Sequence, residues 1–127
     1  MSRLCARLAL LVLALLPLSL SACQPTVDTS DAAREVLFVI APGTAARQAA
    51  GEAVTMLPPV IVLTLGTRDI LVIRNDDREP LTVDGLRIDP GQRAKHRFSA
   101  EGVYQLVCSG AAHSEQVQIR VEGPKKR

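Results

Sequence analysis

The sequence is divided into short runs of aliphatic and β-branched residues that are separated by turn residues. The clearest run lies near the end of the chain, where Val117, Ile119 and Val121 alternate with polar residues. Such alternation is typical of an antiparallel strand with one face in the core and the other in solvent. Further runs, each bounded by turn residues, occupy residues 35–41, 60–65, 69–75, 81–83, 86–88, 93–98 and 103–108. About seven or eight short strands predict an all-β fold, a Greek-key β-sandwich.

Residues 44–56 interrupt this pattern. They are rich in alanine, and three of the alanines are spaced four residues apart, as on one face of a short helix. Gly43 and Gly51 weaken a helix in this segment. We therefore expect a loop with one helical turn. The core must be built from Val, Ile and Leu, because the chain has no tryptophan and few other aromatic residues.

The beginning of the chain has the parts of a secretory signal. Arg3 and Arg7 precede an apolar stretch at residues 8–16, which is too short for a transmembrane helix of about 20 residues. The sequence Leu20-Ser21-Ala22-Cys23 resembles the bacterial lipobox, in which the chain is cleaved before the cysteine and the cysteine is lipidated. This interpretation predicts that Cys23 anchors the protein to a membrane. The alternative is an ordinary signal peptide that is cleaved nearby and leaves Cys23 free.

Cleavage before Cys23 divides the chain into a signal peptide (1–22), a lipid-anchored tether (23–34), one domain (35–123) and a basic tail (124–127). The domain then faces the periplasm in the bacterial cell envelope. Gln24 is not the aspartate that retains enterobacterial lipoproteins in the inner membrane, so by analogy the outer membrane is favoured. Loss of the signal leaves as many acidic as basic residues. No nucleic-acid partner is expected, because such proteins carry a clustered basic face.

The cysteines leave one thiol to be explained. Cys5 lies in the signal and Cys23 is the expected lipidation site, so Cys108 is the remaining free thiol. It is either a small buried hydrophobic residue or a metal ligand. His113 follows five residues later, across a short Ser-Gly-Ala-Ala loop. A thiolate and an imidazole on one short loop are half of a copper site.

Several features follow one another in a distinctive order between residues 35 and 122. They are Pro58-Pro59-Val60-Ile61, Leu71-Val72-Ile73-Arg74-Asn75-Asp76-Asp77, Asp89-Pro90-Gly91, Phe98, Gly102-Val103-Tyr104, and Cys108 followed by His113. In this order and spacing they resemble the cupredoxin family of blue-copper proteins. The resemblance implies a cupredoxin-like β-sandwich with copper as cofactor.

The resemblance also implies a set of ligands. In cupredoxins, two His and one Cys surround the copper, and a weak axial group such as Met or Gln completes the site. Cys108 matches the thiolate and His113 the second imidazole. Leu81 stands where the first histidine is expected. No Met follows His113, and Gln116 is the candidate axial donor, although its alternation with Val117 places it on the outward face.

His96 is the other histidine of the chain. If residues 93–98 and 103–108 form a hairpin, His96 lies opposite Gln105, about 10 Å along the strands from Cys108. A metal–nitrogen bond of about 2 Å cannot span that distance. We therefore expect His96 to be a half-buried strand residue.

Three outcomes remain for the metal. In the first, Cys108 and His113 alone bind Cu(I). In the second, a partner protein or a solvent ligand completes the copper site. In the third, the protein has kept the fold but lost the metal. The leading hypothesis is a lipid-anchored protein that binds copper or transfers electrons to an envelope redox partner. The alternative is a metal-free binding or assembly module. An enzyme is not expected, because no third group is evident that would orient the Cys–His pair.

Overall fold

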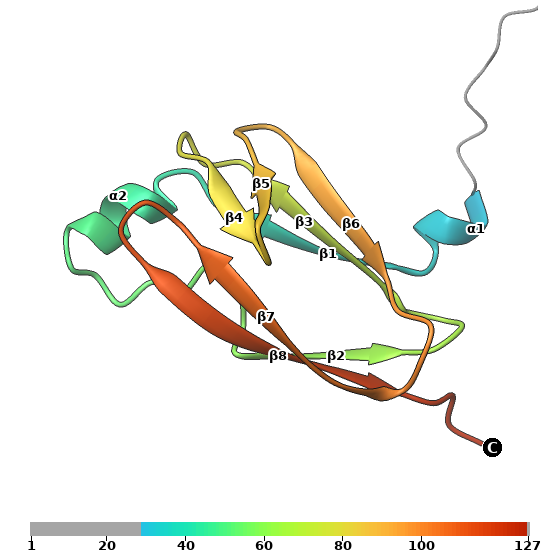
Figure 1. Ribbon diagram of the computed structural model, residues 1–127. Helices are drawn as coiled ribbons and strands as arrows, with labels where there is room; N and C mark the ends of the chain where they lie inside the picture. Colours follow the sequence, from blue (N-terminus) through green and yellow to red (C-terminus); the bar gives the residue numbers. More distant parts are fainter. Residues whose placement is uncertain (1–28, 127) are drawn as a thin grey trace, which may run out of the picture.

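The computed structural model describes residues 29–126, with side chains from residue 31 onward. The predicted signal peptide and Cys23 lie outside the described residues. The elements in chain order (Figure 1) are α1 (Thr29–Ala32), β1 (Glu35–Ile40), α2 (Thr44–Ala49), β2 (Val60–Thr64), β3 (Ile70–Asn75), β4 (Leu81–Val83), β5 (Leu86–Ile88), β6 (Arg93–Arg97), β7 (Gly102–Ser109) and β8 (Ser114–Glu122). Among these residues, no helix is long and apolar enough to cross a membrane.

The strands form two sheets. The three-stranded sheet has the order β1-β3-β6, and the five-stranded sheet has the order β2-β8-β7-β4-β5. β1 with β3 and β2 with β8 are parallel pairs, and the remaining pairs are antiparallel. The chain crosses repeatedly from one sheet to the other. The predicted all-β Greek-key sandwich is confirmed, and it is the fold that the resemblance to cupredoxins implies.

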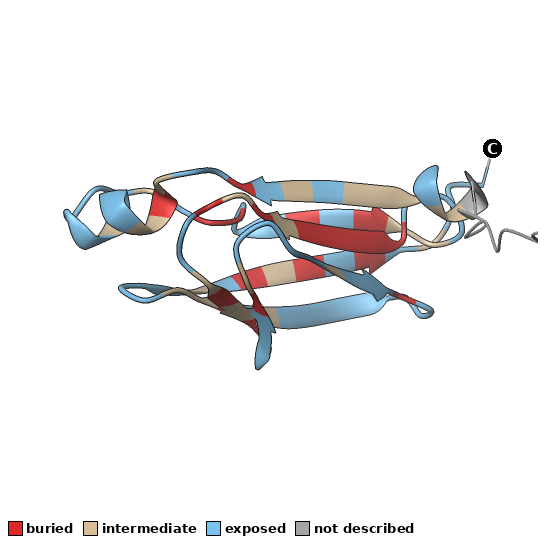
Figure 2. Cartoon of the chain, turned by 90° about the horizontal axis from the view of Figure 1, so that it is seen from above, coloured by how far each residue is buried: buried red, intermediate tan, exposed pale blue. Residues whose placement is uncertain are grey.

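The core lies between the facing sides of the two sheets, and its buried residues lie mainly on the strands (Figure 2). β8 contributes Val117, Ile119 and Val121, the three residues that the alternation assigns to the core. β3 is buried along most of its length because it is the central strand of its sheet. Full burial of such an aliphatic side chain contributes about 1.5–3 kcal/mol, so these strands account for much of the stability.

The predicted hairpin between residues 93–98 and 103–108 is wrong. β6 pairs with β3, whereas β7 pairs with β8 and β4 in the other sheet. The backbone N–H of Phe98 donates to the carbonyl oxygen of Asp69 at 2.9 Å, which keeps the end of β6 beside the start of β3. The following residues carry the chain across to the five-stranded sheet instead of reversing it within one sheet.

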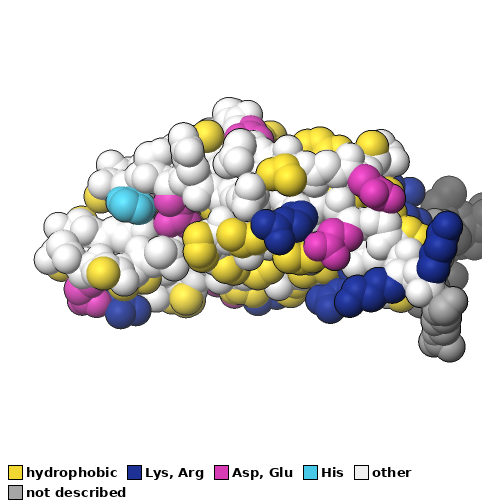
Figure 3. Space-filling model, turned by 90° about the horizontal axis from the view of Figure 1, so that it is seen from below, with side chains coloured by type: hydrophobic (Ala, Val, Ile, Leu, Met, Phe, Trp, Pro, Cys, Tyr) yellow, Lys and Arg dark blue, Asp and Glu magenta, His cyan; other side chains and the backbone are white. Residues whose placement is uncertain are grey.

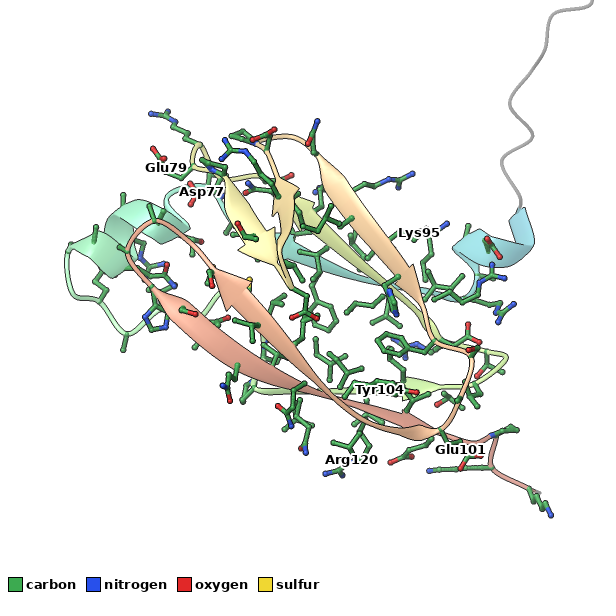
Figure 4. All side chains as sticks on the ribbon, in the orientation of Figure 1. Asp77, Glu79, Lys95, Glu101, Tyr104 and Arg120 are labelled. Atoms are coloured by element: carbon green, nitrogen blue, oxygen red, sulfur yellow. The ribbon has the colours of Figure 1, made fainter. Side chains whose placement is uncertain are left out.

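This crossing leaves a groove of about 530 Å³ between the two sheets, on the side where β6 and β7 lie unpaired with each other. Its apolar lining includes Phe98 and Leu106. Lys95 on β6 and Tyr104 on β7 lie on opposite sides of it (Figure 4). His96 also lines the groove, with its ring 4.6 Å from that of Phe98, centre to centre, in an edge-on arrangement. His96 is exposed, not half-buried as predicted, because the groove is open to solvent.

α2 is the helical turn expected between residues 44 and 56, and a distant carboxylate fixes its start. Asp77 accepts hydrogen bonds from the N–H groups of Gly43 at 2.8 Å and Ala45 at 2.7 Å, so it caps the helix from the β3–β4 loop. Arg78 donates its own N–H to the same carboxylate. Burial alone would raise the pKa of Asp77, but the hydrogen bonds from Ala45, Arg78 and Gly43 outweigh it and lower the pKa below its usual value.

The predicted tether contains α1, and ion pairs hold this segment against the three-stranded sheet. Asp31 pairs with Arg97 and lies 4.0 Å from Lys95. Lys95 also pairs with Glu35 at 2.5 Å, from the opposite edge of the sheet. In Figure 1, α1 and the C terminus lie at one end of the sandwich, whereas α2 and the β7–β8 hairpin lie at the other. We call these the tether end (29–35 and 122–126) and the loop end (40–49 and 109–114).

The outer face of the five-stranded sheet is partly apolar. Hydrophobic side chains gather over the middle of this face in Figure 3. They belong to β2 and β7, on which Val60, Val62, Val103 and Val107 are each at least 40% exposed. Arg120 of β8 lies between β2 and β7 in register with Val62 and Val103 (Figure 4).

Candidate metal centre

Cys108 is the second-last residue of β7, and its thiol points into the core at the loop end. The side chain is fully buried, like those of its neighbours in the core. Burial raises the pKa of this thiol to about 12, and the nearby carboxylates of Glu115 and Asp84 add to the increase. The thiol is therefore protonated at neutral pH. A reactive cysteine has the opposite character, an exposed thiol with a lowered pKa.

The partner of the Cys108 thiol is a second sulfur atom. Its Sγ donates to the Sδ of Met56 at 3.8 Å, and both side chains are buried. Met56 lies in the segment between α2 and β2, 52 residues before Cys108 in the chain. Thiol and thioether are both soft donors of the kind that bind Cu(I). The candidate centre thus has a donor that sequence reasoning missed.

Glu115 connects Met56 to the strand opposite Cys108. In the β7–β8 ladder Glu115 is the direct partner of Cys108, so the two side chains lie on the same face of the sheet. The Glu115 carboxylate accepts hydrogen bonds from the backbone N–H of Met56 at 3.1 Å and of Leu57 at 2.7 Å. These bonds fasten the Met56 segment to the start of β8.

His113 lies in the tight loop between β7 and β8. The N–H of Gly110 donates to the His113 carbonyl oxygen at 2.7 Å, and the hydroxyls of Ser109 and Ser114 are 3.0 Å apart. The His113 side chain is 48% exposed, and its Nε2 is 3.8 Å from the Glu115 carboxylate. Cys108 and His113 are therefore at the same end of the molecule, one beneath the loop and the other on its surface, with Glu115 between them.

The other predicted ligand positions do not add donors. Leu81, where the resemblance expects a histidine, is buried on β4 opposite Ile88. Gln116 is exposed and alternates with the buried Val117, so it lies on the outer face as predicted, away from the side that carries Cys108. His96 belongs to the other sheet. Within residues 29–126, no three His, Cys, Asp or Glu side chains group closely enough to hold a metal ion.

The residues present therefore do not fit a blue-copper centre with two imidazoles, because Leu81 packs in the core instead of offering a nitrogen ligand. Two soft donors, the Cys108 thiol and the Met56 thioether, are in contact in the core, and the His113 imidazole lies at the surface of the same end of the molecule. Met56 carries no signal of a metal ligand in the sequence, because a thioether binds few metals.

Comparison with known proteins gives a weak match. No family model matches the sequence, and no curated protein matches it. Among solved structures, the chain is similar to a purple cupredoxin from Nitrosopumilus maritimus, with 20% sequence identity and a TM-score of 0.49. The match covers 68% of this chain and 99% of that chain. A likeness of this size assigns neither a family nor a residue role. The function must be argued from the residues of this chain.

Proposed function

We propose that this protein is a lipid-anchored, cupredoxin-like protein of the bacterial cell envelope that binds copper through Cys108. The observation that carries the proposal is the position of this thiol. Cys108 is the last inward-facing residue of β7 before the loop that carries His113. On the neighbouring strand β8, Glu115 pairs with Cys108, and its carboxylate is 3.8 Å from the His113 Nε2. A thiolate favours copper in its reduced state, and a bound ion would take the place of the thiol proton. No catalytic role is proposed.

A copper titration tests this function. The chain from residue 24 onward retains the whole core, because every core residue lies between residues 36 and 121. We expect the reduced protein to bind one equivalent of Cu(I) in competition with a Cu(I) chelator. Cys108→Ser should abolish this binding, and His113→Ala should weaken it. If Cys108→Ser binds as much copper as the unaltered chain, the proposed function is wrong.

The competing function is a metal-free binding or assembly module with an envelope partner. The complete burial of the neutral Cys108 thiol favours it, because free cysteines commonly serve as small core residues. The same titration separates the two functions. A metal-free module should bind no copper, and Cys108→Ala should then leave its association with a partner unchanged.

The anchor is a separate part of the proposal. The sequence Leu20-Ser21-Ala22-Cys23 supports lipidation at Cys23. Expression of the full chain in a bacterium with radiolabelled palmitate should label the protein, and Cys23→Ser should abolish the label and release the protein to the soluble periplasmic fraction. We expect the labelled protein in the outer membrane, and Gln24→Asp should shift it toward the inner membrane. A protein that stays in the membrane fraction as Cys23→Ser would show that the anchor is elsewhere.

A further inference from the structure

We propose that β6 binds an extended segment of another protein as an added strand of the three-stranded sheet, and that this segment alternates acidic with apolar residues. The inference goes beyond copper binding and does not depend on it, because it concerns β6 and not Cys108. β6 lies at the edge of its sheet, and β3 is its one neighbour among the described strands. Such an edge offers unpaired N–H and C=O groups to another chain.

The pairing of β6 with β3 shows which of its backbone groups are free. In an antiparallel pair, every second residue directs both its N–H and its C=O group toward the partner strand. The N–H of Phe98 donates to the carbonyl oxygen of Asp69, so Phe98 and every second residue before it face β3. The residues between them direct both groups to the open side of β6: Arg93, Lys95 and Arg97.

The open side of β6 borders the groove between the two sheets, which β6 and β7 both line. Its volume of about 530 Å³ is within the range of ligand sites in proteins. Two apolar side chains of its lining are exposed, Leu86 at 59% and Tyr104 at 37%. A strand added to β6 would direct every second side chain into the groove and cover them. β6 is about 17 Å long, so a segment of about five to seven residues fits.

The outer face of β6 determines the charges that the added strand should carry. Arg93, Lys95 and Arg97 alternate with the inward-facing residues, so all three lie on this face. Asp31 and Glu35 form ion pairs with the second and third of these cations. Within the described residues, Arg93 has no such partner. Opposite charges across a ladder stabilise a strand pair, so carboxylates opposite these cations, above all opposite Arg93, should hold the added strand.

The same charges disfavour a second copy of this chain as the occupant. Two β6 strands paired antiparallel about Lys95 would place Arg93 of each copy opposite Arg97 of the other, and like charges directly opposite each other destabilise a ladder. The other edge strands are β1, β2 and β5. Together they contain one carboxylate, Glu35, which already pairs with Lys95. The acidic strand must therefore come from a different protein.

Two short peptides test the inference. One is Glu-Val-Glu-Leu-Glu-Val-Glu, and the other has lysine in place of every glutamate. Each carries a fluorophore and is titrated with the chain from residue 24. We expect the acidic peptide to bind, with a rise in fluorescence anisotropy, and the lysine peptide to bind at least about tenfold more weakly.

Amide hydrogen exchange locates the peptide on the protein. With the acidic peptide bound, the N–H groups of Arg93, Lys95 and Arg97 should exchange about tenfold more slowly or less. Those of Ala94 and His96, which face β3, should change little. Absence of binding, or binding without this alternating protection, would overturn the inference. It would also fail if the chain alone sediments as a dimer with these amides already protected, because a second copy would then occupy the edge.

Variants of β6 separate the charge from the backbone. Arg93→Glu should weaken binding of the acidic peptide about fivefold or more. Arg120→Glu makes the same change on the other sheet and should have no effect. Lys95→Pro removes the central free N–H at an edge position that tolerates proline, and it should abolish binding, whereas Lys95→Ala should only weaken it. Thermal unfolding checks each fold, and equal losses for Arg93→Glu and Arg120→Glu would contradict the inference even if Lys95→Pro does not fold.

Discussion

At the scale of single residues, a residue of the candidate metal centre could be predicted from the sequence only when it lies close in the chain to the residue that it contacts. Cys108 and His113 could be singled out because they lie five residues apart on one loop. The position of Glu115 beside Cys108 could be predicted only from the register of the β7–β8 hairpin. This register follows from the Ser109–Ser114 pair and does not appear as a sequence motif. The contact of Met56 with Cys108 joins residues that are 52 positions apart, and no local sequence pattern predicts such a contact.

Asp77 allows a prediction at the same scale. Its carboxylate accepts three backbone hydrogen bonds, and an amide in its place would present an N–H group to one of these donors. Asp77→Asn should therefore lower the free energy of unfolding by about 1–3 kcal/mol, measured by urea denaturation. Asp89→Asn, at an exposed pair with Arg87, is the control and should change it by less than about 1 kcal/mol. Equal effects of the two substitutions would contradict this role.

The lowered pKa of Asp77 also gives a pH dependence. A carboxyl group whose pKa is lower in the folded than in the unfolded chain stabilises the fold fully above the unfolded pKa, and this stabilisation is lost as the pH falls through the folded pKa. The difference in unfolding free energy between the unaltered chain and Asp77→Asn should therefore be largest near neutral pH and shrink below about pH 4. A difference that stays constant down to pH 2 would show that the charge is not involved.

At the scale of elements, the strands could be located but not all of their partners. Each predicted run is a strand in the structure, and its ends differ from the predicted ends by at most two residues, because alternation and turn residues are local signals. The predicted β6–β7 hairpin was wrong because β6 pairs along its whole length with β3, and the residues after Phe98 carry the chain to the other sheet. The parallel partners of β1 and β2 have no local signal at all.

The β4–β5 turn gives a prediction for one element. Asp84 and Gly85 have φ angles of 47° and 84°, the positive values of a two-residue hairpin turn. Gly85→Ala should lower the free energy of unfolding by about 1–2 kcal/mol, because a Cβ disfavours this conformation although nothing lies within 4 Å of it. Thermal unfolding measures the change, and Arg87→Ala serves as the exposed control on β5. An unchanged midpoint for Gly85→Ala would indicate that the turn adopts another conformation.

At the scale of the whole molecule, the start of the described chain and the candidate metal centre lie at opposite ends. At the tether end, Asp31 of α1 pairs with Arg97 of β6. The β7–β8 loop lies at the other end of the sandwich (Figure 1), and Cys108 is the second-last residue of β7 before this loop. A lipid on Cys23 would thus hold the tether end toward the membrane and direct the loop end away from it. Copper would be exchanged with proteins of the periplasm.

Fluorescence quenching can measure this orientation. A fluorophore on Lys125→Cys, at the tether end, should be quenched by lipids that carry a headgroup quencher when the lipidated protein is in vesicles. The same fluorophore on Ala111→Cys, at the loop end, should be quenched much less. The buried Cys108 should not react with the label in the folded protein. Equal quenching at both positions would show that the domain lies flat or tumbles on its tether.

The parallel pairing of β2 with β8 has a consequence for the rate at which the chain folds. β8 is the last strand to be synthesised, yet it lies between β2 and β7 in the five-stranded sheet. The sheet cannot be completed until residues about 58 positions apart have met, and topologies dominated by such distant contacts fold on millisecond to second timescales. The five-stranded sheet therefore stays incomplete until β8 has been made. That delay would suit the export through a membrane channel that the predicted signal peptide implies.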